Sequence, residues 1–175
     1  MDFFDAVKKR RSTRAYSEKP IDAKKLTQLL EAVNSAPSAR NLQSYEIFVA
    51  KTEEKKKALF ASSSGKDYVF KAPVVLVFCA NPKRVGVSAA RPMSKEAMEL
   101  LAIEDATIAA SYCQLAATAL GLSTVWIGSF NRDDVLKAIR DTEGLIPITV
   151  MPVGYPAEEP EAKPRRSLSE LVHEI

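Results

Sequence analysis

The chain has 175 residues, of which 46% are hydrophobic and 27% charged, and its formal net charge at pH 7 is +3. This length and apolar content predict a single domain over residues 1–175 with a buried core. The mild basic excess allows an anionic ligand but falls short of the large basic patch of a dedicated nucleic-acid binder. A signal-peptide pattern and a run of roughly 20 apolar residues, as a membrane span needs, are both missing.

Reactive side chains are scarce in this sequence. The two cysteines, Cys79 and Cys113, lie in apolar neighbourhoods, which predicts buried thiols and a cytoplasmic protein. The single histidine, His173, leaves no Ser–His or Cys–His pair for catalysis and no histidine metal cluster. Neither a P-loop nor a Gly-x-Gly-x-x-Gly motif occurs. An enzyme so poor in reactive groups would take its chemistry from a bound cofactor.

Two helical patterns open the chain. The first covers residues 2–10, with Phe3 and Phe4 on its apolar side. The second begins after Asp22, a suitable N-cap, and ends before Pro37, and its apolar residues recur at helical spacing. The elements expected next are a strand over 45–50 and a short charged helix over 53–60.

The second half of the chain is more apolar. The β-branched and aromatic run of 73–79 predicts a strand buried on both faces. An Ala-rich helix follows over 95–120, ended by Gly121 as its C-cap residue. Because its second half is apolar nearly all round, we expect a second subunit to cover it. The remaining elements are a strand over 123–127, a helix over 131–140, a strand over 147–153 and an extended tail over 157–175. Helices and strands do not alternate strictly, so the predicted fold class is α+β.

Two basic segments have both a plain and a functional explanation. Residues 9–14 read Lys-Arg-Arg-Ser-Thr-Arg and follow the first helix, where cations interact favourably with the helix dipole. Arginines beside a serine hydroxyl also suit a phosphate dianion, because guanidinium groups donate two parallel hydrogen bonds. Residues 163–166 read Lys-Pro-Arg-Arg, and such a basic cluster in a tail is usually solvated.

Two polar loops, each taken alone, also have both a plain and a functional explanation. Residues 36–43 have the composition of a simple turn, yet Asn41 and Gln43 bring amide groups that a flavin ring edge or ribityl chain could use. In residues 126–130, Gly128 would let a flat ligand approach the backbone closely. The plain alternative there is a strand-to-helix turn with Ser129 or Asn131 near the cap.

In this order the segments resemble the nitroreductase family over nearly the whole chain. The matching pieces are Arg10-Arg11-Ser12-x-Arg14, Pro37-Ser38-x-x-Asn41-x-Gln43, Ala119-Leu120-Gly121-Leu122, Trp126-Ile127-Gly128-x-Phe130, Val153-Gly154-Tyr155-Pro156 and Lys163-x-Arg165. No single motif is diagnostic, whereas the ordered set is hard to obtain by chance. The sequence departs from the family at Ser44-Tyr45, where many relatives have Pro-Trp, and at Gly128, where one branch has Glu.

The resemblance implies a central mixed sheet flanked by helices, completed by homodimerisation, with an FMN in each of two interface sites. Arg10, Ser12, Arg14, Lys163 and Arg165 would then hold the phosphate, with Arg11 beside them. Pro37, Ser38 and Asn41 would come from the partner subunit and lie against the flavin, in a loop that also contains Ala39 and Gln43. The backbone around Gly128 and Ser129, after Ile127, would meet the N5 and O4 edge of the ring.

The implied activity is hydride transfer from NADH or NADPH through flavin N5 to a small organic acceptor such as a quinone or nitroaromatic, in two half-reactions. The natural acceptor, the preferred nucleotide and the pocket-shaping residues within 81–95 stay open. Within the family, the alternative is a flavin-fragmenting or dehalogenating enzyme. From another class, the alternative is a nucleic-acid-binding module that uses 8–14 and 163–166. Against it, Phe3 and Phe4 are expected in the core, and the sequence lacks an aromatic stacking platform.

Overall fold

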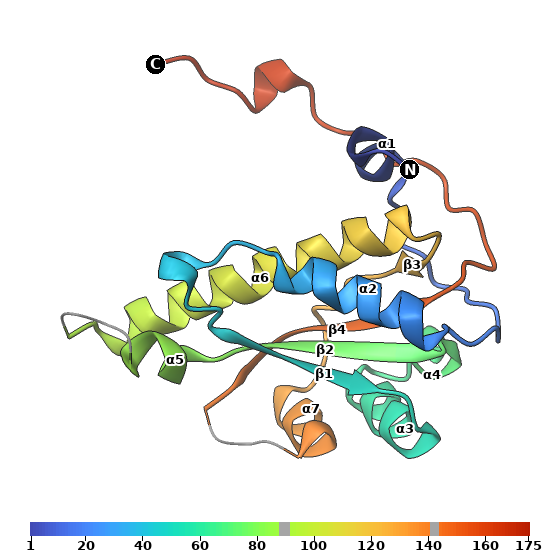
Figure 1. Cartoon of the computed structure of the whole chain (residues 1–175), viewed down its shortest axis with the longest axis horizontal. Coiled ribbons are helices and arrows are strands. Elements are labelled where there is room, and N and C mark those ends of the chain that lie inside the picture. The colour runs from blue at the N-terminus through green and yellow to red at the C-terminus, as the bar shows by residue number, and fades with distance from the viewer. Residues whose placement is uncertain (88–91, 141–143) are drawn as a thin grey trace.

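A four-stranded sheet forms the centre of the computed structural model, which describes residues 1–87, 92–140 and 144–175 (Figure 1). The strands are β1 (Tyr45–Ala50), β2 (Val74–Ala80), β3 (Ser123–Thr124) and β4 (Ile146–Gly154), in the order β1-β2-β4-β3. All three neighbouring pairs are antiparallel. We expected a mixed sheet, with some parallel pairs of strands. Among the described residues, the parallel pairing consists of one isolated bridge between Ser12 and Thr124. The reason is that the segment around Ser12 is an irregular connection and forms no strand.

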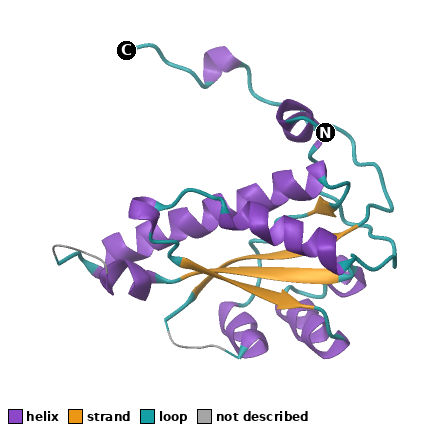
Figure 2. Ribbon diagram, in the orientation of Figure 1, coloured by secondary structure: helices purple, strands orange, loops and turns teal. Residues whose placement is uncertain are grey.

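Helices cover both faces of this sheet, as expected for an α+β fold (Figures 1 and 2). On one face lie α2 (Ala23–Asn34) and α6 (Lys95–Ala119), and on the other α3 (Glu53–Ser62), α4 (Asp67–Lys71) and α7 (Arg132–Ile139). The remaining helical elements are α1 (Phe3–Lys9), α5 (Pro82–Val87) and the 3-10 turns η1 (Ala39–Asn41) and η2 (Leu168–Glu170). Both α1 and α5 pack against α6. The sequence did not predict α4 or α5.

The central strand β2 divides the core into two clusters. Every residue of β2 is buried, which confirms the prediction for this run. Leu76 and Phe78 pack with α2 and α6, whereas Val75 and Val77 pack with the helices of the opposite face. Alternate side chains of a strand point to opposite faces, so one apolar run builds both halves of the core.

The long helix α6 begins and ends as its sequence predicts. The side chain of Ser94 caps its N-terminus by accepting a hydrogen bond from the backbone of Ala97. Gly121 has a φ of +71° after its C-terminus, and its N–H donates to the carbonyl of Thr118 at 3.0 Å. The N–H of Leu122 donates to Ala117 at 2.8 Å, which completes a Schellman motif.

Strand β3 is shorter than the predicted strand over 123–127. It ends at Thr124, and the pairing resumes at Ile127, whose N–H and carbonyl both bond Val150 at 3.2 Å. In the antiparallel register, Val125 falls opposite Pro152. Because proline has no N–H to donate, the ladder is interrupted there.

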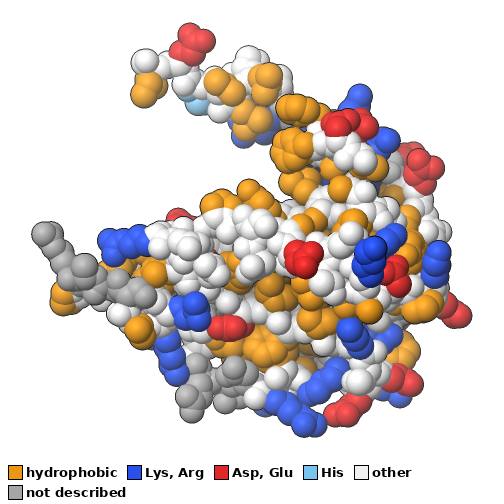
Figure 3. All heavy atoms as spheres, viewed as in Figure 1, with side chains coloured by type: hydrophobic (Ala, Val, Ile, Leu, Met, Phe, Trp, Pro, Cys, Tyr) orange, Lys and Arg blue, Asp and Glu red, His pale blue; other side chains and the backbone are white. Residues whose placement is uncertain are grey.

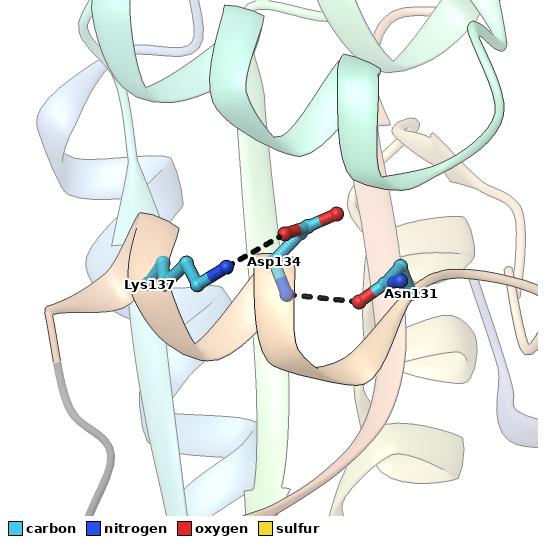
Figure 4. Close-up of polar contacts among 3 residues, drawn as sticks. All are labelled: Asn131, Asp134 and Lys137. Carbon is cyan, nitrogen blue, oxygen red and sulfur yellow. Dashed lines mark hydrogen bonds and ion pairs between the residues drawn. The ribbon is translucent and has the colours of Figure 1, made fainter.

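Helix α7 fixes the turn that follows this interrupted strand. Asn131 accepts a hydrogen bond from the N–H of Asp134 at 3.1 Å, and Lys137 contacts the Asp134 carboxylate at 3.3 Å (Figure 4). The N–H of Asn131 donates to the carbonyl of Ser62 at 2.8 Å. The turn before α7 is therefore tied to the end of α3.

Helix α1 carries large apolar side chains into solvent in the single chain. Phe3 is 64% exposed and Phe4 80% exposed. The expectation that both belong to the core is therefore wrong. The helix buries only Ala6, because it lies on the side of α6 that faces away from the sheet. The tail after Pro156 is extended, as predicted, apart from the short turn η2.

A close approach at the end of β4 gives a test of this packing. A methyl group on Gly154 would lie 2.7 Å from Cδ of Pro73 and 3.0 Å from Cδ1 of Tyr16. Neither ring can move easily, so Gly154→Ala is expected to lower the free energy of unfolding by about 1–3 kcal/mol. Denaturant unfolding measures this change. Gly128→Ala is the control, since its methyl group would meet Trp126 at an ordinary 3.6 Å, and an equal loss in both variants would contradict the packing argument.

Candidate functional site

Basic side chains from the two ends of the chain converge in one pocket of about 470 Å³. Arg10, Arg11, Ser12 and Arg14 come from the segment after α1, and Lys163 and Arg165 come from the C-terminal tail. About 150 positions of the sequence separate these two groups, and the fold brings them together in one pocket.

Backbone hydrogen bonds build this pocket by joining residues 12–17 to β3 and to the start of the tail. The N–H of Thr13 donates to Thr124 at 3.0 Å, and the N–H of Ala157 donates to Ala15 at 2.9 Å. Tyr16 is buried below them, and its hydroxyl donates to the carbonyl of Thr13 at 2.7 Å. Burial raises the pKa of Tyr16 far above its ordinary value, so the hydroxyl stays a donor.

The electrostatics of the pocket favour an anion. Burial lowers the pKa of Arg10, and the nearby positive charges of Arg165 and Arg11 lower it further. Over the described residues, none of the pocket's five cations is in an ion pair. The guanidinium of Arg11 donates to the carbonyl of Lys8 at 2.6 Å, and that of Arg165 to the carbonyl of Lys163 at 3.3 Å. A doubly charged anion would relieve the repulsion within this group.

Glu158 also lines the pocket, and the sequence did not single it out. Its carboxylate accepts hydrogen bonds from the N–H groups of Arg14 and Ala15, the latter at 3.2 Å. It thus fixes the backbone of the basic segment against the tail. Nothing in the local pattern distinguishes Glu158 from Glu159 or Glu161, because its partners are backbone groups about 140 residues away.

The predicted polar loop over 37–43 lies against the middle of α6, and no described contact joins it to the basic pocket. Pro37 and Asn41 are exposed, and Ser38, Ala39 and Gln43 are half-buried. Ser38 Oγ accepts a hydrogen bond from the N–H of Gln43 at 2.9 Å, and the Gln43 amide donates to Asn41 Oδ1 at 3.1 Å. These two hydrogen bonds within the loop help to fix its shape.

The predicted turn at 127–129 is a third, separate feature. Ile127 is buried, whereas Gly128 and Ser129 are exposed. The ammonium group of Lys66 donates to the carbonyl of Ser129 at 3.2 Å and to that of Ser63 at 2.7 Å. The structure thus adds a cation, Lys66, to this turn, and the residues around it gave no signal in the sequence.

The family model described as "Nitroreductase family" matches residues 7–155 of this chain. That span includes the basic segment after α1, the polar loop and the turn after β3. The chain belongs to the nitroreductase family. The basic residues of the tail lie outside the matched span.

The relatives of this chain match it over almost all of its length. An "FMN reductase [NAD(P)H]" of Bacillus subtilis is 31% identical over 94% of this chain and 70% of its own length. An "NADH dehydrogenase" of Thermus thermophilus is 32% identical over 98% of this chain and 95% of its own. The structure of the NADPH:FMN oxidoreductase of Vibrio harveyi complexed with NAD+ is 27% identical and has a TM-score of 0.88, covering 98% of this chain and 74% of that one.

The described residues contain few other features that could support chemistry. Within the part of the chain that the structure describes, no group of three His, Cys, Asp or Glu side chains could hold a metal ion. No helix in the same residues is long and apolar enough to cross a membrane. Cys79 and Cys113 are both buried outside any disulfide, as predicted. Burial raises the pKa of Cys113 to about 12, so its thiol stays protonated near neutral pH.

Of the residues 81–95 suggested to shape a substrate pocket, 88–91 lie outside the described residues.

Proposed function

We propose that this chain is an FMN-dependent oxidoreductase that transfers hydride from NADH or NADPH to a small organic acceptor, such as a nitroaromatic or a quinone. The basic pocket between the segment after α1 and the tail is the observation that carries this proposal. Membership of the nitroreductase family supports it, as do the names of the relatives, which describe FMN reductases and NAD(P)H oxidoreductases.

The residues of the pocket fit the phosphate end of FMN. A phosphate dianion accepts several charge-assisted hydrogen bonds, and Arg10, Arg14 and Arg165 provide planar donors for it. Ser12 adds a hydroxyl donor, and Lys163 adds a compact positive charge. When bound, FMN would supply the hydride chemistry, while the protein holds and orients it.

A homodimer would bring the other two features to the flavin. The polar loop over 37–43 and the basic pocket are separate within one chain, which supports a site shared between two subunits. The outer side of α6 exposes Leu100 by 57% and Tyr112 by 40% of their surface. Hydrophobic side chains gather over α1 at the top of Figure 3. We therefore propose that α1 and the outer side of α6 form the subunit interface, with the loop of one subunit against the flavin of its partner.

One argument against the nucleic-acid hypothesis no longer holds, but the structure provides another. Exposure of Phe3 and Phe4 removes the objection that they are core residues. However, five cations of these segments (Arg10, Arg11, Arg14, Lys163 and Arg165) line one pocket rather than a long stripe. A pocket of this kind suits one small anion better than a polymer of phosphates.

We also propose that residues 1–175 act as one domain in the cytoplasm, in keeping with the buried thiols.

Flavin binding and turnover test the proposed function directly. Purified protein mixed with FMN is expected to retain the flavin through gel filtration and to show visible flavin absorbance that bleaches with NADH or NADPH under anaerobic conditions. Steady-state kinetics are expected to be ping-pong, because donor and acceptor would use the same site in turn. A protein that takes up no FMN would refute the proposal, and intersecting double-reciprocal lines would refute the shared site alone.

A further inference from the structure

A buried carboxylate lies in the middle of α6. Asp105 is 1% exposed, and the side chains that share its buried face are mostly alanine. It is in no ion pair within residues 1–87, 92–140 and 144–175. Burying a charge without a counter-ion is unfavourable, so such a group persists where several hydrogen bonds stabilise it.

Within the described residues, the hydrogen-bond partners of Asp105 belong to the two ends of one loop. Oδ1 accepts a hydrogen bond from the N–H of Ala39 at 2.8 Å. Oδ2 accepts from the N–H of Ser44 at 3.3 Å and from its hydroxyl at 2.5 Å. A single carboxylate therefore holds the start and the end of residues 39–44, the last part of the segment that connects α2 to β1.

The loop between these two ends has an unfavourable backbone conformation. Arg40, Asn41 and Gln43 have φ values of +51°, +57° and +49°. Residues with a Cβ rarely adopt this left-handed region, and they remain there only where the surroundings hold them. From outside the loop, Arg84 donates to the carbonyl of Leu42 at 3.3 Å and the N–H of Asn81 donates to that of Ser44 at 2.8 Å. Among the described contacts, the carboxylate of Asp105 is the one that holds both ends.

We propose that Asp105 is a positioning residue for the flavin: by holding both ends of residues 39–44, it keeps Asn41 and Gln43 in the conformation that meets the cofactor of the partner subunit. This inference rests on the proposed function, because the loop is assigned to flavin contact there. It adds a residue that lies behind the loop and does not itself touch the cofactor.

Asp105→Asn tests this inference with little change of shape. Asparagine keeps one acceptor oxygen and replaces the other by an NH2 group, which accepts no hydrogen bond. The N–H groups of Ala39 and Ser44, which bond different oxygens of Asp105, therefore cannot both keep their acceptor. We expect hydrogen exchange of the amides of 39–44 in the flavin-free protein to rise. We also expect the Kd of FMN to rise about 10-fold, which corresponds to a binding-competent loop population of about one tenth. Because the loop is expected to meet the ring, riboflavin is expected to lose the same factor.

Two further variants separate positioning from a general loss of stability. Ser44→Ala removes the hydroxyl donor and keeps both backbone contacts, so its effect on both measurements is expected to be smaller in the same direction. Cys113→Ser places a polar group on the same buried face of α6, about two turns further along. It is expected to lower the thermal stability without changing loop exchange or flavin affinity.

The outcomes judge the inference and the proposed function separately. Unchanged loop exchange in Asp105→Asn, or raised exchange with unchanged flavin affinity, would overturn the positioning role. An equal loss of affinity in Cys113→Ser would overturn it too, since stability alone would then explain the result. If the unmodified protein binds no flavin, the proposed function fails and this inference fails with it, whereas the exchange data still report whether Asp105 holds the loop.

Discussion

Replacing Phe4 by serine is expected to weaken the proposed homodimer about 100- to 20 000-fold while leaving the fold of each subunit intact. Phe4 is 80% exposed in the single chain, so its removal costs the isolated subunit little. Burying a phenylalanine contributes about 1.5–3 kcal/mol. A symmetric dimer contains two copies, so the loss is about 3–6 kcal/mol of association free energy, which gives the stated range of Kd. Analytical ultracentrifugation over a concentration series measures it.

Val49→Ser is the matched control for the interface. Val49 is also exposed, at 38%, but it lies on β1, away from α1 and the outer side of α6. Its replacement is expected to leave the dimer unchanged. An FMN-loaded protein that sediments as a monomer, or a Phe4→Ser variant that dimerises like the unmodified protein, would remove α1 from the interface.

The elements with strong local patterns could be predicted from the sequence. The apolar run of β2 and the capped, Ala-rich α6 were both found close to their observed bounds. The helices α4 and α5 were missed because five and six residues are too few to show a helical period. The early end of β3 depends on Pro152, a residue that only the sheet register brings opposite Val125. Such a contact leaves no mark in the local sequence.

The residues of the candidate site also differ in whether the local sequence could indicate them. The two basic segments were visible in the sequence, but their convergence was inferred from the family resemblance and needed the fold to test it. Asp105 and Lys66 were missed because they bond backbone groups of distant segments. Phe3 and Phe4 were assigned to the core because apolar residues are usually buried, a rule that does not distinguish a core from a surface that another subunit could cover.

Removal of single cations from the basic pocket is expected to have the second large effect. Arg14→Ala and Lys163→Ala are each expected to raise the Kd of FMN about 10- to 100-fold, with the fold largely unchanged. The physical reason is the loss of one charge-assisted hydrogen bond, which contributes about 1.5–3 kcal/mol. Both side chains are exposed in the free chain, so solvent screening favours the lower part of this range. Titration of flavin fluorescence or absorbance measures each Kd.

Riboflavin and a neighbouring arginine provide the controls. Riboflavin lacks the phosphate, so its affinity is expected to stay nearly constant in both variants. Arg165 lines the pocket, whereas the guanidinium of Arg166 donates to the carbonyl of Glu170 within the tail. Arg165→Ala is therefore expected to weaken FMN binding more than Arg166→Ala, although the two residues are adjacent in sequence. If FMN and riboflavin lose affinity in parallel, or if all four variants bind FMN like the unmodified protein, the pocket does not hold the phosphate. A parallel loss would instead indicate that these cations stabilise the ring end of the site or the fold around it.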